Sequence, residues 1–186
     1  MVDEEKKVSH AGIPQAVFVE DVDSFMALSA NKGNAEKVLR RLDEQHNKYK
    51  FMELNLLAKR KRLKNQIPDL ERSMDMIRLL KKHKAESGEE EILTEFLLSE
   101  QLYSKAKINP KNTVYLWLGA NVMLEYTLED AADLLSKNIE SAKQQETTIE
   151  EDLDFLRDQF TTTEVNMARV YNWDVKRRQA LNNNSS

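Results

Sequence analysis

Two long stretches of the chain carry a seven-residue repeat of apolar side chains. In the first stretch the apolar row is Leu42, Tyr49, Leu56, Leu63, Leu70 and Ile77. The row three residues before each of these is mixed: Leu39, His46, Glu53, Arg60, Ile67 and Met74. An apolar row beside a half-apolar row predicts one strand of a coiled coil, held more tightly where both rows are apolar.

The first stretch also carries signals for where its helix begins and ends. Asn34 can cap the helix, and basic residues at 81–84 followed by Gly88 suit its end. Pro68 removes a backbone donor inside the helix and should bend it. The repeat continues in phase through Pro68, so we expect one bent helix over residues 34–88.

The second stretch begins at Thr127, with Asp130 at the spacing of a capping box. One row is Leu128, Leu135, Ala142, Ile149, Leu156, Thr163 and Val170. The other row is Ala132, Ile139, Glu146, Leu153, Phe160 and Met167. Both rows are largely apolar, so a second coiled-coil helix is predicted over residues 127–178, with a frayed, disordered tail at 179–186.

The connection between these stretches, residues 92–126, changes to a period of two. Alternating or continuously apolar runs at 94–98, 101–108, 114–118 and 122–126 predict four strands, with turns at 99–100 and 119–121. A connection this short cannot run back along the whole length of the first helix before the second helix begins, so the two helices should be antiparallel. The predicted fold is therefore mainly α: a long antiparallel α-helical coiled coil with two β-hairpins inserted between its helices.

Hairpins of this size cannot build a core of their own, and apolar faces and free edges need partners. We therefore expect the chain to be one subunit of an oligomer that assembles through its hairpins. The interface residues expected from the second hairpin are Val114, Leu116, Leu118, Val122 and Leu124.

Composition narrows the function classes. The chain has 186 residues, 28 basic and 32 acidic side chains, a net charge of −4 and no cysteine. This balance gives no global attraction for nucleic acid or membrane, and the missing cysteines exclude disulfides and thiolate zinc sites. The N-terminus lacks an apolar signal core, and no apolar run is long enough to span a membrane. A soluble cytoplasmic protein is expected, with the nucleus as a further location and a disordered segment at 1–11.

Residues that could carry chemistry are sparse. The three histidines are His10, His46 and His83, and none has a second ligand at helical spacing. There is no Gly-rich phosphate loop, and the acidic clusters fit solvated surface. The basic run at 59–64 could be a nuclear-localisation or nucleic-acid patch, but a solvated coiled-coil face is favoured. We therefore predict no enzyme activity, no cofactor and no metal.

Several large apolar side chains lie off the predicted seam. Phe51 and Leu54 do so in the first helix, and Tyr171 and Trp173 in the second. All lie in the half of the coiled coil far from the hairpins, the tip. Two explanations remain open: these side chains bind something, or the extended apolar segment at 12–26 folds back and covers them.

Four blocks of sequence resemble a known family. Residues 12–26, 48–56, 117–126 and 150–178 are similar to α-class prefoldin subunits, and the resemblance covers about 12–178. It implies a hetero-hexamer with one further α-class and four β-class subunits, whose hairpins form a β-barrel platform. It also implies capture of non-native actin and tubulin and their transfer to the cytosolic chaperonin without ATP, with no catalytic residues to carry over.

The resemblance and the weak seam together place client binding at the tip. The residues expected to bind non-native proteins are Leu39, Leu42, Tyr49, Phe51, Phe160, Met167, Val170, Tyr171 and Trp173. Methionine and aromatic side chains suit an adaptable apolar surface. The competing hypothesis is a structural coiled-coil adaptor that binds one folded partner, such as a microtubule or ubiquitin-ligase component.

Overall fold

The structure is a computed structural model that describes residues 9–87 and 91–183. The chain divides into two compact units. The tip unit contains residues 1–62 and 146–186, and the hairpin unit contains residues 63–145. Two long helices, α2 (Ala35–Ser87) and α3 (Leu128–Asn183), contribute to both units, and each unit is described by itself.

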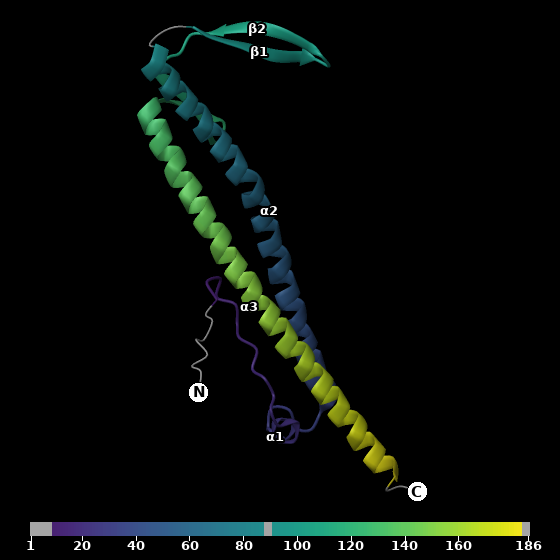
Figure 1. The fold of residues 1–186 in the computed structure, drawn as a ribbon. Coiled ribbons are helices and arrows are strands. Elements are labelled where there is room, and N and C mark those ends of the chain that lie inside the picture. The colour runs from purple at the N-terminus through teal and green to yellow at the C-terminus, as the bar shows by residue number, and fades with distance from the viewer. Residues whose placement is uncertain (1–8, 88–90, 184–186) are drawn as a thin grey trace. The chain divides into compact units, whose positions relative to one another are not determined.

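In both units the predicted apolar rows form the seam between α2 and α3 (Figure 1). In the tip unit Val38 and Leu42 pack with Val170, so the start of α2 lies beside the end of α3. In the hairpin unit Met74 and Ile77 pack with the start of α3 in the same way. The helices are therefore antiparallel, and the mainly α coiled-coil fold predicted from the sequence is confirmed.

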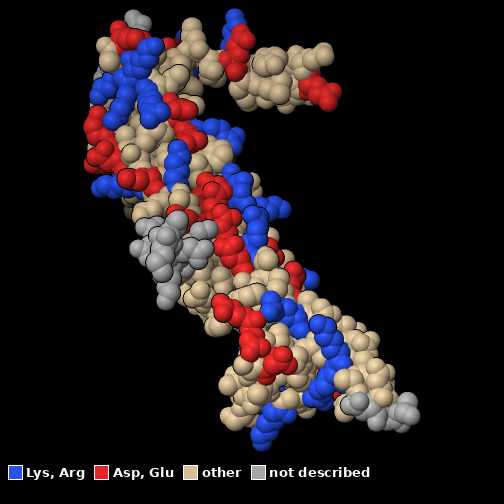
Figure 2. Space-filling model, turned by 60° about the horizontal axis from the view of Figure 1, so that its bottom comes forward, with Lys and Arg blue, Asp and Glu red and all other residues tan. Residues whose placement is uncertain are grey.

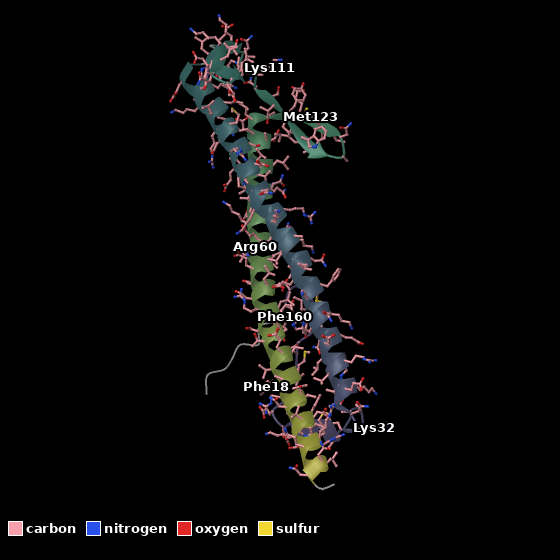
Figure 3. All side chains as sticks on the ribbon, turned by 90° about the vertical axis from the view of Figure 1, so that its right-hand side faces the viewer. Phe18, Lys32, Arg60, Lys111, Met123 and Phe160 are labelled. Atoms are coloured by element: carbon pink, nitrogen blue, oxygen red, sulfur yellow. The ribbon has the colours of Figure 1, made fainter. Side chains whose placement is uncertain are left out.

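Two polar members of the weak row, His46 and Arg60, are half-buried and paired across the seam. His46 Nε2 lies 3.1 Å from the Glu164 carboxylate, and its ring meets the Phe160 ring edge-on at 5.0 Å. Arg60 lies 3.1 Å from Glu150; Arg60 and Phe160 are labelled in Figure 3. These pairs place opposite charges together at seam positions, although the buried Arg60 Nε has no hydrogen-bond partner. Partly exposed ion pairs contribute at most about 1 kcal/mol each.

The hairpin unit contains two separate antiparallel hairpins. Strand β1 (Ile92–Ser99) pairs with β2 (Leu102–Ile108), and β3 (Thr113–Gly119) pairs with β4 (Val122–Thr127). Ala120 and Asn121 both have positive φ angles, 48° and 61°, as a two-residue type I′ turn requires. The strands match the expected ones and are slightly longer at most ends.

The β3–β4 hairpin is anchored on the helices of its own unit. Val114, Leu116 and Tyr126 pack against a cluster that includes Ile77 and Leu128. The Thr127 hydroxyl accepts a hydrogen bond of 3.1 Å from Asp130 N, which caps α3 as the sequence predicted. The β1–β2 hairpin has exposed apolar side chains on both faces, and the hairpin at the top right of Figure 2 is mostly tan.

Three sequence expectations need correction. Residues 9–11 were expected to be disordered, but Ser9 Oγ, His10 N and Ala11 N donate hydrogen bonds to Asp152 Oδ1. Residues 22–26 of the segment expected to be extended belong to a short helix, α1 (Val22–Ala27), because Asp21 accepts a capping hydrogen bond from Asp23 N. Helix α3 continues to Asn183 rather than ending at 178, since Gln179, Ala180 and Leu181 favour helix and no Gly or Pro interrupts it.

Some expectations fall on residues that the structure does not describe. Those for 1–8, for Gly88 and for the last three residues lie outside the described ranges. Helix α2 passes through Pro68 without a break, as expected. None of the described helices has a stretch long and apolar enough to cross a membrane.

Candidate functional site

An extended N-terminal segment lies along α3 in the tip unit (Figure 1). We call residues 9–21 the strap. It docks on a row of α3 side chains that recur every seven residues, and we call this row the ladder: Asp152, Gln159, Asn166 and Trp173. The first three of these are buried and polar, so each needs a hydrogen-bond partner.

The strap supplies those partners mainly through its main chain. Asp152 Oδ1 accepts a hydrogen bond of 2.8 Å from His10 N, and Gln159 Oε1 accepts one of 2.8 Å from Ala16 N. Asn166 binds the strap twice: its Oδ1 accepts from Val19 N at 2.9 Å and its Nδ2 donates to Val17 O at 2.8 Å. The same hydrogen bonds therefore satisfy the buried polar side chains of the ladder and the main-chain groups of the strap.

The spacing of these contacts follows from backbone geometry. Ala16 and Val19 are three residues apart, and their partners Gln159 and Asn166 are seven apart. Three extended residues span about 9–10 Å, and seven helical residues span about 10.5 Å. Between Ala16 and Val19 the two repeats nearly match, so these two amides meet equivalent positions on α3. Towards the N-terminus the match is lost, because His10 and Ala16 are six residues apart and their partners are also seven apart.

The side chains of the strap follow the same period of three. Ile13, Ala16 and Val19 are buried, whereas Val17 is 81% exposed. On α3, Phe155 lies four residues before Gln159 and is also buried. The strap is thus apolar on the side that faces the coiled coil and open to solvent on the other.

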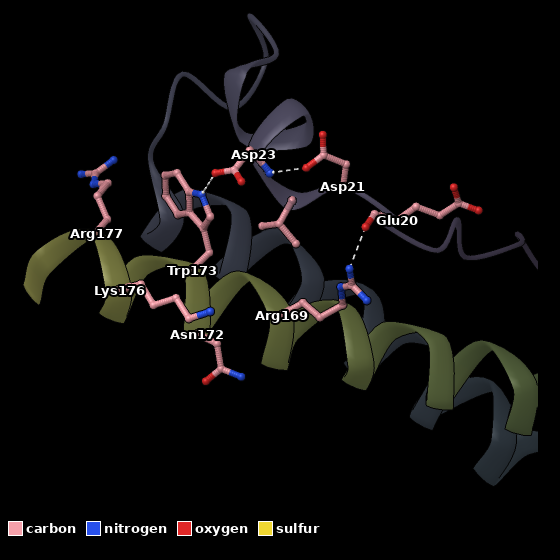
Figure 4. A pocket seen from close by; sticks show the side chains of 9 residues that line it. Glu20, Asp21, Asp23, Arg169, Asn172, Trp173, Lys176 and Arg177 are labelled. Carbon is pink, nitrogen blue, oxygen red and sulfur yellow. Dashed lines mark hydrogen bonds between the residues drawn. The ribbon is translucent and has the colours of Figure 1, made fainter. Parts of the chain in front are cut away.

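The ladder ends at Trp173, beside a polar hollow under α1 (Figure 4). Trp173 Nε1 donates to Asp23 Oδ1 at 2.6 Å, and Arg169 donates to Glu20 O at 2.6 Å. Arg177 lies over the Trp173 ring at 5.3 Å and donates to Gly33 O at 2.7 Å. These contacts fix the C-terminal end of the strap and α1 to α3.

The same region contains a carboxyl group with a shifted pKa. A hydrogen bond from the Ser24 hydroxyl, helped by the backbone N–H of Asp23, holds the pKa of Asp21 below its usual range. Asp21 therefore stays ionised, and able to cap α1, to lower pH than an ordinary aspartate.

The structure divides the residues that the sequence placed in a client-binding surface. Leu42, Tyr49 and Val170 are buried, because they belong to the strong seam rows that hold the helices together. They offer no free surface here, which corrects that part of the prediction. The half-buried members are Leu39, Phe160, Met167 and Trp173, and the exposed ones are Phe51 and Tyr171.

Part of the remaining set forms one open groove. Leu39 of α2 and Met167, Ala168 and Tyr171 of α3 line it, and charged side chains rim it: Glu36, Arg40 and Asp43. A second apolar hollow lies further along α2, at Phe51 and Met52. We call the first one the tip groove.

The alternative that the N-terminal segment covers the off-seam side chains holds for only some of them. Trp173 is covered in part by α1 and its flanking residues. Phe51 remains 67% exposed and Tyr171 60% exposed. The strap therefore covers one face of the tip unit and leaves the tip groove open.

The expected hairpin interface also divides. Val114 and Leu116 are half-buried on the helices of their own chain, whereas Leu118, Val122 and Leu124 are exposed. The opposite row of the same hairpin, which the sequence analysis did not include, is also exposed: Tyr115, Trp117 and Met123. These alternate with the anchored row, and Met123 is labelled in Figure 3.

The histidines lie in ion pairs or alone rather than in clusters. His10 Nε2 lies 2.8 Å from Glu151, and His46 is paired with Glu164. Within the described ranges, no three His, Cys, Asp or Glu side chains are grouped so that they could hold a metal ion. The sequence reasoning also missed the ladder, although three polar residues at heptad spacing were visible as its signal.

Comparison with known proteins places this architecture in a family. The model of the prefoldin family, described as "Prefoldin subunit", matches residues 49–173. The prefoldin subunit 3 of Drosophila melanogaster is 58% identical, with 95% of this chain and 88% of that protein covered. The human prefoldin subunit 3 is also 58% identical, with 91% and 84% covered.

More distant relatives agree. The prefoldin subunit 3 of Saccharomyces cerevisiae is 43% identical, with 91% of this chain and 87% of that protein covered. A chain of filamentous prefoldin from Methanocaldococcus jannaschii, solved by cryo-EM, has 16% identity and a TM-score of 0.39, covering 57% of this chain and 90% of that one. That likeness is too low to carry an argument, but the family model and the curated relatives suffice: the chain belongs to the prefoldin family.

Proposed function

We propose that this chain is a subunit of a hetero-hexameric prefoldin that captures non-native proteins, actin and tubulin among them, and passes them to the cytosolic chaperonin without using ATP. The partners in the hexamer are one further α-class and four β-class subunits. The proposal extends the family membership to an activity, and it assigns that activity to binding surfaces rather than to catalysis.

The observation that carries the proposal is the tip groove. It is apolar at its floor, open to solvent and lined by Leu39, Met167 and Tyr171. Exposed apolar surface of this kind is unusual in a protein without a partner there. A methionine and an aromatic side chain can adapt to irregular apolar sequences, which suits many clients better than one folded partner.

The test uses the assembled hexamer with a doubly substituted subunit, Leu39→Ser with Tyr171→Ser. Suppression of the aggregation of denatured actin should weaken, because each lost apolar contact removes about 1–3 kcal/mol from binding. The other arms should be shortened in this assay so that they do not compensate. Trp173 is left intact, because it holds Asp23 and α1.

A matched control is available on α2 in the hairpin unit. Met76 and Leu79 are also exposed apolar residues, 58% and 54% exposed, and they lie outside the tip unit. Met76→Ser with Leu79→Ser should leave capture unchanged. Equal capture by both variants and the unmodified hexamer would contradict the proposal and favour an adaptor that binds a folded partner elsewhere.

The hairpins supply the proposed assembly surface. Trp117 and Tyr115 point away from the row that packs on the helices, and β1–β2 exposes Leu93, Leu97 and Tyr103. These apolar rows and the free strand edges need cover in solution. Pairing with the hairpins of neighbouring subunits would bury both at once.

A further inference from the structure

We propose that the ladder on α3 is a second binding site for non-native chains, which the strap occupies in cis. An extended client segment with a small or β-branched apolar side chain at every third residue would take the place of the strap. The inference rests on the proposed client capture, but it concerns a surface different from the tip groove.

The first argument is that the site binds main-chain atoms. Most hydrogen bonds to the strap from α3 and from Tyr49 involve backbone groups: His10 N, Ala11 N, Pro14 O, Ala16 N, Val17 O, Val19 N and Glu20 O. The side-chain exceptions lie at the N-terminal end, where Ser9 Oγ bonds Asp152 and His10 Nε2 bonds Glu151. Apart from the N–H that proline lacks, every polypeptide carries these backbone groups in extended segments. Recognition through them does not depend on sequence, as binding of many different clients requires.

The second argument concerns which side chains the site accepts. Ile13, Ala16 and Val19 are buried against the coiled coil, whereas Val17 and Phe18 between them are exposed. The site therefore requires an extended backbone and modest apolar side chains at a period of three. Folded proteins rarely expose such a stretch with its main chain free, but non-native proteins do.

The third argument is that the strap can leave without the tip unit unfolding. It forms no sheet with the helices and buries only three apolar side chains, two of them alanine or valine. The seam beneath it is held separately by Leu42, Leu156 and Val170. The anchors at Trp173 and Arg177 hold α1 and the turn after it, so release can begin at the N-terminal end.

The covalent link between the strap and the rest of the chain explains why the strap, and not a client, occupies the ladder when no client is held. A segment joined to its own site acts at an effective concentration on the order of millimolar. A free peptide at micromolar concentration therefore competes poorly with it. A non-native protein that is already held at the tip groove gains the same advantage, because its neighbouring segments are then tethered too.

The first experiment measures binding of a labelled peptide with the sequence of residues 9–21 to the assembled prefoldin complex. The peptide should bind at least ~10-fold more tightly to a complex whose subunit lacks residues 1–19 than to the complete complex. In the shortened subunit, Asn166→Leu should abolish this gain, because it removes the partner of both Val19 N and Val17 O.

Two peptide variants at adjacent positions provide a matched control. Ala16→Asp places a charge at a buried position and should prevent binding, whereas Val17→Asp changes an exposed position and should not. Equal binding of these two peptides, or equal binding of the parent peptide to complete and shortened complexes, would overturn the inference.

The second experiment needs no shortened subunit. Hydrogen exchange at the amides of Ala16 and Val19 is followed in the complete complex, with and without denatured actin. Exchange should accelerate at least several-fold when actin is bound. If actin binds while both amides keep their protection, the inference is overturned and the proposed capture stands. If the complex does not hold actin under any of the conditions tested, the proposed function itself is overturned.

Discussion

Tyr49 connects the seam to the strap through a single side chain. It is 0% exposed, and it is the largest fully buried side chain in the described part of the molecule. Its ring meets Phe160 edge-on at 6.1 Å, and its hydroxyl donates to Pro14 O at 2.7 Å and accepts from Gln45 at 2.7 Å. A seam residue of α2 therefore also supplies a hydrogen bond to the strap.

Tyr49→Phe tests this role, since it keeps the ring and removes only the hydroxyl. The loss leaves Pro14 O and Gln45 without their partner and should lower the free energy of unfolding by about 1–2 kcal/mol. Urea unfolding of the assembled complex measures it. Tyr171→Phe, at an exposed position, should change stability by less than about 0.5 kcal/mol; equal effects would contradict the assigned role.

Asp21 provides a pH-dependent prediction at the same scale. Because the hydrogen bond from Ser24 lowers its pKa, the cap on α1 contributes stability that is fully present above the unfolded pKa of about 3.9. That contribution is lost as the pH falls through the lower, folded pKa. NMR signals of Asp23 and Ser24 should therefore keep their capped shifts at pH 4; loss of the cap between pH 5 and 6 would be inconsistent with this assignment.

At the scale of elements, the β3–β4 hairpin has two faces with different tasks. Val114, Leu116 and Tyr126 bind it to the helices, and Tyr115, Trp117 and Met123 face outward. A substitution in the first row damages the subunit itself. A substitution in the second row reports on assembly alone, which makes it the cleaner test.

Trp117→Asp should therefore prevent incorporation into the hexamer and leave the helix content nearly unchanged. The side chain is 60% exposed in the isolated chain, so its replacement costs the subunit little, but a charge in a buried interface costs several kcal/mol. Size-exclusion chromatography and circular dichroism measure the two effects. Met76→Asp is the control and should assemble normally; a Trp117→Asp subunit found at full occupancy would rule out the hairpin interface.

At the scale of the whole molecule, exposed apolar surface is the feature that both units share. Apolar side chains remain exposed in both units, on the hairpins and in the tip groove. Basic and acidic side chains are interspersed over the face shown in Figure 2. This distribution fits a protein that works by holding other chains.

Capture should accordingly be independent of nucleotide. The sequence contains no Gly-rich phosphate-binding loop, so we expect ATP not to change the affinity for clients. The amount of denatured actin held by the hexamer should be the same with and without ATP and magnesium. A reproducible change in affinity on adding ATP, with saturable heat in calorimetry, would refute this.

The coiled coil and hairpins were predictable because their signals are local and periodic. The seam rows of α2 and α3 follow heptads, and strands at 92–127 follow a period of two. The strap was not predictable in the same way. Its period of three at Ile13, Ala16 and Val19 becomes visible only beside the helix that it meets, residues 152–166.

Burial removes three of the expected client residues from the free surface for a related reason. Leu42, Tyr49 and Val170 have the same side-chain chemistry as a binding surface, but the seam uses them. The sequence shows which residues are apolar, but their exposure depends on how the helices and the strap pack. Tyr171 and Phe51 stay free because the seam and the strap cover other faces of their helices.

The match of three strap residues to seven helix residues fixes the register of the strap on α3. One residue inserted between Ala16 and Val19 would move the Val19 amide away from Asn166 and turn its side chain toward solvent. A change of three residues in the strap would keep its inner side facing α3 but shift it by a full heptad. We therefore expect length variation between Ala16 and Val19 to be tolerated only in steps of three, with compensation in steps of seven on α3.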